Sequence, residues 1–392
     1  MKARKIKEGV YWVGVVDWDR RLFDSLIPLP DGTSYNSYLI QGSEKTVLVD
    51  TVDPAMAETF FSKLEGIKNI DYLIANHGEQ DHSGLIPQVL EKYKNAKVVT
   101  SSKGKEILMN LLPIPEEKFI IVNDWETISL GNKTLEFIHT PWVHWPETMV
   151  TYLKEDRILF SCDFFGSHLA TSDLYASDEA RVYEAAKRYY AEIMMPFRKT
   201  IQKNVEKLKD REIEIIAPSH GPLYERPGFI IDAYRDWISD VPKNVAVIPY
   251  ISMHGSIRKM VEYLVGALAE RDVKVHQFDL AVTDLGKLAE TLVDAATIVI
   301  GTPTIHGGAH PNVIYATYVA NVIKPKAKFA SIISSYSWGG RVVEQITGML
   351  PNLKVEVLPS VVCKGLPKEA DLKALDNLAD AIAEKHKGLN LG

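Results

Sequence analysis

The hydrophobic pattern along the chain changes character at about residue 240. Before that point, short apolar runs that predict β-strands are separated by irregular stretches and occasional helices. The first of these strands follow one another closely, as hairpins do, which predicts a mixed sheet. The predicted strands are TVLVD, DYLIA, AKVVTS, TLEFIH, MVTYL, RILFSC and EIEIIA, and the predicted helices include AMAETFFSKLEG and the long stretch from Ser177 to Lys209.

From about residue 243 the chain alternates strictly between strands and helices. The helix after the first strand has one apolar face, made by Ile257, Met260, Val261, Leu264, Val265 and Leu268. Strands that alternate with helices predict a doubly wound parallel sheet. Pro242 and Asn244 interrupt the pattern, so we predict one domain over residues 1–242 and a second over residues 243–392. The five strands of the second domain are VAVIPY, VKVHQFDL, TIVIGTPT, KFASIISS and KVEVLP.

The net charge, the cysteine count and the lack of long apolar runs limit the classes of protein to which this chain can belong. The formal net charge is −6 and no block of like charge occurs, which gives no sign of nucleic-acid binding. Two cysteines cannot supply a Cys₄ iron site, and so few thiols favour a reducing compartment. The basic N-terminus lacks the apolar core of a signal peptide, and no apolar run approaches the ~18 residues of a membrane span. We therefore expect a cytoplasmic protein that does not contact membranes.

Metal-ligand residues follow several predicted strands of the first domain. The stretch NHGEQDHSG comes directly after IDYLIA and holds His77, Glu79, Asp81 and His82. Further candidates follow later strands, and loop residues at strand ends can meet at one rim of a sheet. The complete set is His77, Glu79, Asp81, His82, His144, Asp163 and His220.

The spacing of these residues suits two metal ions better than one. His77 and Glu79 share parity in an extended segment and can face one ion, while Asp81 and His82, beyond a bend, can face a second. If each ion has four protein ligands, one residue must bridge, and Asp163 is the natural bridge. The other interpretation is a set of packed polar residues, but unpaired buried charge on this scale is costly.

Three loops of the second domain resemble a mononucleotide site. After VAVIPY, the loop ISMHGS opens a helix, where backbone N–H groups and the helix dipole bind a single phosphate. Residues 245–390 are similar to flavodoxin, a resemblance that implies bound FMN. It implies phosphate contacts from Ser252, Met253, His254, Gly255, Ser256 and Ile257, and ring contacts from Pro303, Thr304, Ile305, Gly307, Gly308, Ser335, Tyr336, Trp338 and Gly339.

The first domain resembles the metallo-β-lactamase superfamily, which implies an αββα fold. Its hydrolases carry His-x-His-x-Asp-His at this strand end, and the resemblance covers roughly residues 30–225, including Asp50. Glu79 stands where the hydrolases have histidine. A carboxylate is a harder ligand than imidazole and adds negative charge, which favours iron over zinc. Glu79, Asp81 and Asp163 together contribute −3 against the +4 of two ferrous ions.

The combination of both domains resembles the flavodiiron proteins, also called A-type flavoproteins or rubredoxin:oxygen oxidoreductases. The resemblance implies that the seven ligands hold two non-haem iron ions and that FMN relays electrons to them. It implies reduction of O₂ to water, of NO to N₂O, or of both, with rubredoxin or a similar protein as the donor. It also implies a head-to-tail homodimer or a dimer of dimers. Residues expected close to the metals are Trp145, His168, Tyr189 and Tyr190.

Two other classes of protein stay open. One is a zinc-dependent hydrolase of the metallo-β-lactamase superfamily with an accessory flavodoxin-like module, and Glu79 argues against it. The other is a flavin- or iron-based redox sensor, and the full complement of ligands argues for turnover instead. Metal analysis together with an absorption spectrum separates these classes.

Overall fold

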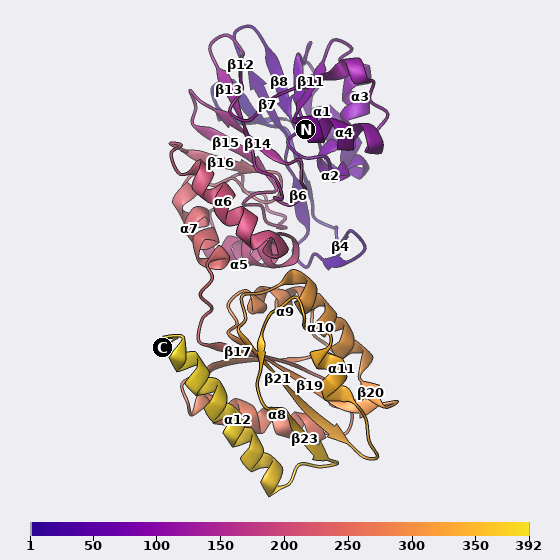
Figure 1. The fold of residues 1–392 in the computed structure, drawn as a ribbon. Coiled ribbons are helices and arrows are strands. Elements are labelled where there is room, and N and C mark those ends of the chain that lie inside the picture. Colours follow the sequence, from indigo (N-terminus) through magenta and orange to yellow (C-terminus); the bar gives the residue numbers. More distant parts are fainter. Residues whose placement is uncertain (1, 392) are drawn as a thin grey trace. The chain divides into compact units, whose positions relative to one another are not determined.

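The computed structural model describes residues 2–391, which form two compact units (Figure 1). One unit holds the residues up to Tyr190 together with Phe197–Ile238. The other holds Ala191–Pro196 together with the chain from Ser239 onward. The predicted domain limits at residues 242 and 243 stay a prediction, because contact within a unit does not show that it folds alone.

The first unit contains two large β-sheets. The first sheet is antiparallel from β1 to β8 and parallel from β8 to β11, which confirms the predicted mixed sheet. Its strands, in spatial order, are β1 (Arg4–Lys7), β2 (Val10–Trp12), β7 (Tyr38–Gln41), β8 (Thr46–Val49), β9 (Tyr72–Ile74), β10 (Lys97–Thr100) and β11 (Phe119–Ile121). The second sheet orders β12 (Thr127–Ser129), β13 (Thr134–His139), β14 (Met149–Leu153), β15 (Ile158–Cys162) and β16 (Ile215–Pro218). Two short pairs join β3 (Val15–Asp17) to β6 (Thr33–Tyr35) and β4 (Leu22–Phe23) to β5 (Ile27–Pro28).

Alternation along β8 shows how the layers pack. Val47 and Val49 belong to a core between the two sheets, together with Phe137 of β13 and Phe160 of β15. Leu48, one residue away, faces the opposite core, which the helices on the outer side of the first sheet complete. Figure 1 shows these helices beside the first sheet and α5–α7 beside the second. This is the layered arrangement expected for a lactamase-like fold. The helices of the unit are α1 (Ala57–Lys63), α2 (Gln80–Ser83), α3 (Ile86–Lys92), α4 (Ser102–Leu111), α5 (Glu179–Tyr189), α6 (Arg198–Leu208) and α7 (Pro227–Ile238).

The second unit is a parallel sheet covered by helices. Its strand order β18-β17-β19-β21-β22 is the flavodoxin-like order, and every pair along it is parallel. The strands are β17 (Val245–Tyr250), β18 (Lys274–Asp279), β19 (Thr297–Ile305), β20 (Gly308–Ala309), β21 (Phe329–Tyr336), β22 (Glu356–Val357) and β23 (Val361–Lys364). The helices are α8 (Ser256–Ala269), α9 (Leu285–Leu292), α10 (Pro311–Ile323), α11 (Val342–Thr347) and α12 (Glu369–Gly388).

One predicted helix is broken and one predicted strand is shortened in the structure. The long helix predicted from Ser177 to Lys209 is α5 and α6, separated by a π-turn, Tyr190–Met194, and a 3₁₀ turn, Met195–Phe197. Pro196 lacks the N–H that a continuous helix needs, which is the physical reason for the break. The fifth predicted strand, KVEVLP, forms only the two-residue strand β22, because Pro359 cannot donate to a strand ladder. Pairing with β21 resumes beyond the predicted strand, in β23.

None of the helices within residues 2–391 is long and apolar enough to cross a membrane. The cysteines Cys162 and Cys363 are both buried and free.

The core of the second unit contains a buried histidine, His386, which should make the free energy of unfolding depend on pH. His386 of α12 lies 2.7 Å from Thr297 Oγ1 through Nε2 and 2.8 Å from Asn244 Oδ1 through Nδ1. Burial lowers the pKa of His386 to about 4. The unfolded chain therefore takes up this proton near pH 6.5, before the folded protein does. The stabilising contribution is complete above pH 6.5 and is lost as the pH falls towards 4.

We expect this imidazole to make the protein about 2 kcal/mol less stable at pH 5 than at pH 8. The measurement is denaturant unfolding of the wild type and of His386→Gln at both pH values. The two proteins share every other acid-sensitive group, so the difference between them isolates His386. An identical pH dependence in the variant would contradict the assignment.

Candidate metal centre

The seven candidate ligands meet at one rim of the first unit. β9 leads to His77 and Glu79, and the short helix α2 turns the chain so that Asp81 and His82 face a neighbouring point. The remaining three ligands lie after β13, β15 and β16, and they are His144, Asp163 and His220. All seven are buried except Glu79 and His144, whose side chains are 15% exposed.

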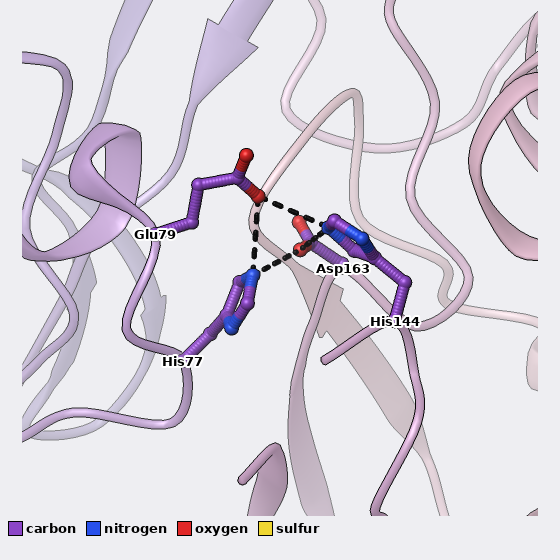
Figure 2. A group of neighbouring side chains, drawn as sticks. All are labelled: His77, Glu79, His144 and Asp163. Carbon is purple, nitrogen blue, oxygen red and sulfur yellow. Dashed lines mark hydrogen bonds and ion pairs between the residues drawn. The ribbon is translucent and has the colours of Figure 1, made fainter. Parts of the chain in front are cut away.

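The ligands form two groups that share Asp163. The first ligand group is His77, Glu79, His144 and Asp163, shown in Figure 2, where dashed lines join both carboxylates to both imidazoles. Glu79 Oε2 lies 3.1 Å from His77 Nε2 and 3.0 Å from His144 Nε2. Asp163 Oδ2 lies 3.4 Å from each of the same two nitrogens.

The second ligand group is Asp81, His82 and His220, with the other oxygen of Asp163. Asp81 Oδ2 lies 3.2 Å from both His82 Nε2 and His220 Nε2. Asp163 Oδ1 lies 3.0 Å from His82 Nε2 and 3.4 Å from His220 Nε2. Each oxygen of Asp163 therefore faces a different group, which is the geometry of a bridging carboxylate.

The separations fit cation binding better than hydrogen bonding. Ligand atoms about 2.1 Å from one cation lie ~3.0 Å apart at right angles and ~3.4 Å apart at tetrahedral angles. Several of the converging atoms are buried and take part in no hydrogen bond, namely both oxygens of Asp81, both oxygens of Asp163 and both ring nitrogens of His82. Such atoms are costly without a partner, and metal ions would satisfy them. The residues present therefore fit a two-metal site, and the identity of the ligands stays a prediction.

The electrostatics of the cluster follow from opposite charges in a buried place. Burial by itself would lower the pKa of His220, but the neighbouring carboxylates of Asp163 and Asp81 raise it to about 10. Burial likewise opposes the charged form of His144, but Asp163 and Glu79 raise its pKa to about 9. The carboxylates thus create a negative electrostatic potential at the cluster, which favours the binding of two cations.

Residues outside the two groups orient the ligands. Asp50 accepts hydrogen bonds from the backbone N–H of Asn76 at 2.9 Å and from its side chain at 3.0 Å, which fixes the chain just before His77. His220 Nδ1 donates to the Ser34 carbonyl at 2.7 Å. His77 Nδ1 contacts Glu147 Oε1 at 2.8 Å. Sequence reasoning missed Ser34 and Glu147, although Glu147 stands only three residues after His144.

The four residues expected near the metals divide into two kinds. The Trp145 ring lies edge-on to His77 with centroids 4.9 Å apart, and the His168 ring lies 4.7 Å from that of His220. Tyr189 lies 4.9 Å from His168. Tyr190 is different, because its hydroxyl donates to the Trp237 carbonyl at 3.3 Å and its ring packs on Tyr234 and Trp237. Within residues 2–391, Tyr190 makes no hydrogen bond or ring contact to a ligand or to His168. Of the two tyrosines expected near the metals, Tyr189 is therefore the one that lies next to His168.

A cavity of about 510 Å³ leads to the ligands. Glu79, Asp81 and Trp145 line it, and the β4–β5 hairpin contributes Phe23 and Asp24 to the lining. The other lining residues are Arg20, Asp53, Pro54, Gln80, Gly84, Leu111 and Leu112. Small molecules can therefore reach both groups from one side.

The second unit has its own cavity at the carboxyl ends of its parallel strands. Its volume is about 490 Å³, and Gly255, with φ of 90°, ends the first loop where α8 begins. The cavity brings together all of the predicted FMN contacts except Gly255 and Gly308, and it adds His306, Ser337 and Gly365, which sequence reasoning missed. Trp338 is 89% exposed on its edge. The location matches the general rule that ligands bind outside the carboxyl ends of such strands.

Comparison with known proteins gives relatives that match nearly the whole chain. A family described as "ODP family beta lactamase" matches residues 33–221. The nitric oxide reductase of Moorella thermoacetica is 34% identical over 97% of this chain and 98% of its own. The type A flavoprotein fprA of Rhodobacter capsulatus is 33% identical over 94% of this chain and 88% of its own.

Among solved structures, the rubredoxin:oxygen oxidoreductase of the anaerobe Desulfovibrio gigas superimposes with a TM-score of 0.95 and 28% identity over all of both chains. The agreement covers both units and nearly the whole length of the chain. The chain therefore belongs to the flavodiiron proteins, the family of type A flavoproteins.

Proposed function

We propose that this protein reduces O₂ to water, NO to N₂O, or both, at a non-haem diiron centre, with FMN passing electrons to it from an external donor. The observation that carries the proposal is the pair of ligand groups joined by Asp163, with a carboxylate, Glu79, in the first group. Two irons held by these residues would supply electrons one at a time and would bind small diatomic gases when reduced. Reduction of O₂ takes four electrons and four protons, and reduction of two NO takes two of each.

The residues of the chain divide the remaining tasks. The seven ligands would hold the irons, namely His77, Glu79, Asp81, His82, His144, Asp163 and His220. His168 has a buried Nε2 without a hydrogen-bond partner beside His220, and we propose that it donates to the bound gas or to a water next to it. Trp145, which packs on His77, would limit access of water from the cavity.

The donor and the assembly are also part of the proposal. Rubredoxin is proposed as the electron donor, because the similar protein from Desulfovibrio gigas is named for it. A head-to-tail homodimer, or a dimer of dimers, is proposed from the family resemblance and is tested by sedimentation. A cytoplasmic location is proposed from the two buried free cysteines, Cys162 and Cys363.

The deciding experiment combines composition and turnover. The purified protein is analysed for iron, zinc and flavin, and is then supplied with reduced rubredoxin under O₂ or under NO. We expect iron and FMN, with consumption of O₂, formation of N₂O, or both. Zinc without flavin, together with hydrolase activity, would replace the proposal by the zinc-dependent hydrolase.

A charge introduced into the phosphate loop tests the flavin site. Ser256 is the first residue of α8 and lines the cavity of the second unit. The substitution Ser256→Asp suits a helix N-terminus but sets a carboxylate against the phosphate, a repulsion of roughly 4 kcal/mol at 4 Å. We expect FMN affinity to fall more than tenfold and rubredoxin-driven turnover to fall with it, while iron content stays unchanged.

The matched control is Ser102→Asp, which adds the same charge at the exposed first residue of α4. It should leave FMN binding unaltered. Retention of FMN by Ser256→Asp, measured by fluorescence on release, would place the phosphate elsewhere.

A further inference from the structure

A buried carboxylate, Glu147, contacts the first ligand group without belonging to it. Its Oε1 accepts hydrogen bonds from His77 Nδ1 at 2.8 Å and from the backbone N–H of Gly78 at 2.9 Å. The side chain is 1% exposed, and its Oε2 has no hydrogen-bond partner. The carboxylate charge is therefore aimed at one imidazole.

The second ligand group has no equivalent. His220 Nδ1 donates to a neutral group, the carbonyl of Ser34, and His82 Nδ1 has no partner. Within residues 2–391, His77 is the only ligand histidine hydrogen-bonded to a carboxylate outside the two groups. The asymmetry lies between the groups and so between the two metal positions.

The local structure holds Glu147 in this position. Ser101 Oγ donates to the Glu147 carbonyl at 3.0 Å. Gly78, the middle residue of His77-Gly78-Glu79, leaves room for the carboxylate. A Cβ there would lie 3.2 Å from Glu147 Oε1 and 2.7 Å from Ile107 Cγ2. A residue with a side chain at position 78 would therefore crowd both Ile107 and the Glu147 carboxylate, whereas glycine lets the carboxylate lie close to the backbone.

A carboxylate on the far nitrogen of an imidazole fixes its tautomer and makes the metal-facing nitrogen a stronger donor. It also adds negative charge. The first group has Glu79 and Glu147 besides the shared Asp163, whereas the second has Asp81 besides Asp163. The more negative group stabilises the more highly charged, ferric state.

We infer that Glu147 makes the two iron sites unequal: it positions His77 and lowers the reduction potential of the iron in the first ligand group relative to the iron in the second. The inference rests on the proposed diiron function. Glu147 is a positioning residue here, because it acts through His77. Because an iron with the lower reduction potential is oxidised first, the iron held by the first ligand group would lose its electron before the iron held by the second.

The test is a redox titration of Glu147→Gln followed by electron paramagnetic resonance. Glutamine keeps the shape and an oxygen that accepts from His77 and Gly78, but lacks the charge. We expect two irons to be retained, with the lower-potential iron step shifted upward and the interval between the two steps narrowed. The maximum mixed-valent signal should fall, and the FMN potentials should stay unchanged.

The matched control is Glu136→Gln. Glu136 is also a buried carboxylate, paired with Arg211 at 2.8 Å and with Lys154 at 3.7 Å, and it belongs to neither ligand group. This variant should lose stability but keep both iron potentials.

The possible outcomes test the inference about Glu147 separately from the proposed diiron function. Loss of one iron per chain from Glu147→Gln, with the other retained, supports the inference, because affinity at the first group depends on the same charge. Unchanged potentials at full occupancy, or an equal shift or equal loss at both sites, overturns it and leaves the proposed function intact. A wild-type protein without iron overturns the proposed function itself.

Discussion

Replacing Asp163 with alanine is expected to empty both metal positions. Its Oδ2 faces His77 and His144, and its Oδ1 faces His82 and His220. Both oxygens are buried without a hydrogen bond, and metal ions would satisfy them. Without this carboxylate, each group loses a ligand and the cluster loses a charge that offsets two cations. Iron per chain, measured by mass spectrometry, should fall by more than tenfold, because two weakened sites lose the shared bridge together.

The matched comparison is His82→Ala, which removes a ligand of the second group alone. We expect this variant to keep the iron of the first group. Circular dichroism of both variants checks that the sheets remain folded. Near-full iron in Asp163→Ala would show that Asp163 does not bridge, whereas equal losses in both variants would show that the two positions fill only together.

The fold was predictable where one residue pattern dominated. Strict alternation of strand and helix indicated the parallel sheet of the second unit, because parallel neighbouring strands need a crossover connection and each such connection here contains a helix. The early strands β1 to β6 are only two to four residues long, so local periodicity carries little signal for them. Two of them, β2 and β3, also pair with strands that lie beyond their chain neighbours, namely β7 and β6. The helix broken around Pro196 and the predicted strand shortened before Pro359 show that proline chemistry can override the hydrophobic pattern.

The candidate site was predictable to the level of ligands but not of their partners. Four metal-ligand residues within six positions at a strand end are a strong local signal. Glu147 gains its role only through contact with His77, 70 residues away, and no local pattern records that. The choice between Tyr189 and Tyr190 is similar. Adjacent helical residues point about 100° apart, so the packing of α5 decides which one meets His168.

Glu79→His is expected to change the preferred metal from iron to zinc and to abolish reduction of O₂. Glu79 Oε2 lies between the two imidazoles of the first group, at 3.1 Å from His77 and 3.0 Å from His144. A third imidazole there makes the donor set softer and removes one of the three negative charges among the ligands. We expect the zinc-to-iron ratio to rise and oxygen consumption with reduced rubredoxin to fall by at least about 100-fold, because zinc cannot exchange electrons.

The variant Glu79→Gln separates charge from donor type in that result. It keeps an oxygen ligand of the same length and removes only the charge. If charge decides, Glu79→Gln should also lose ferric iron, although without the gain of zinc that a third histidine brings. The FMN content of both variants should match that of the wild type, since the flavin cavity belongs to the other unit. A Glu79→His protein that binds iron and consumes oxygen at the wild-type rate would show that this carboxylate does not select the metal, and the distinction from the zinc hydrolases would then have to lie elsewhere in the site.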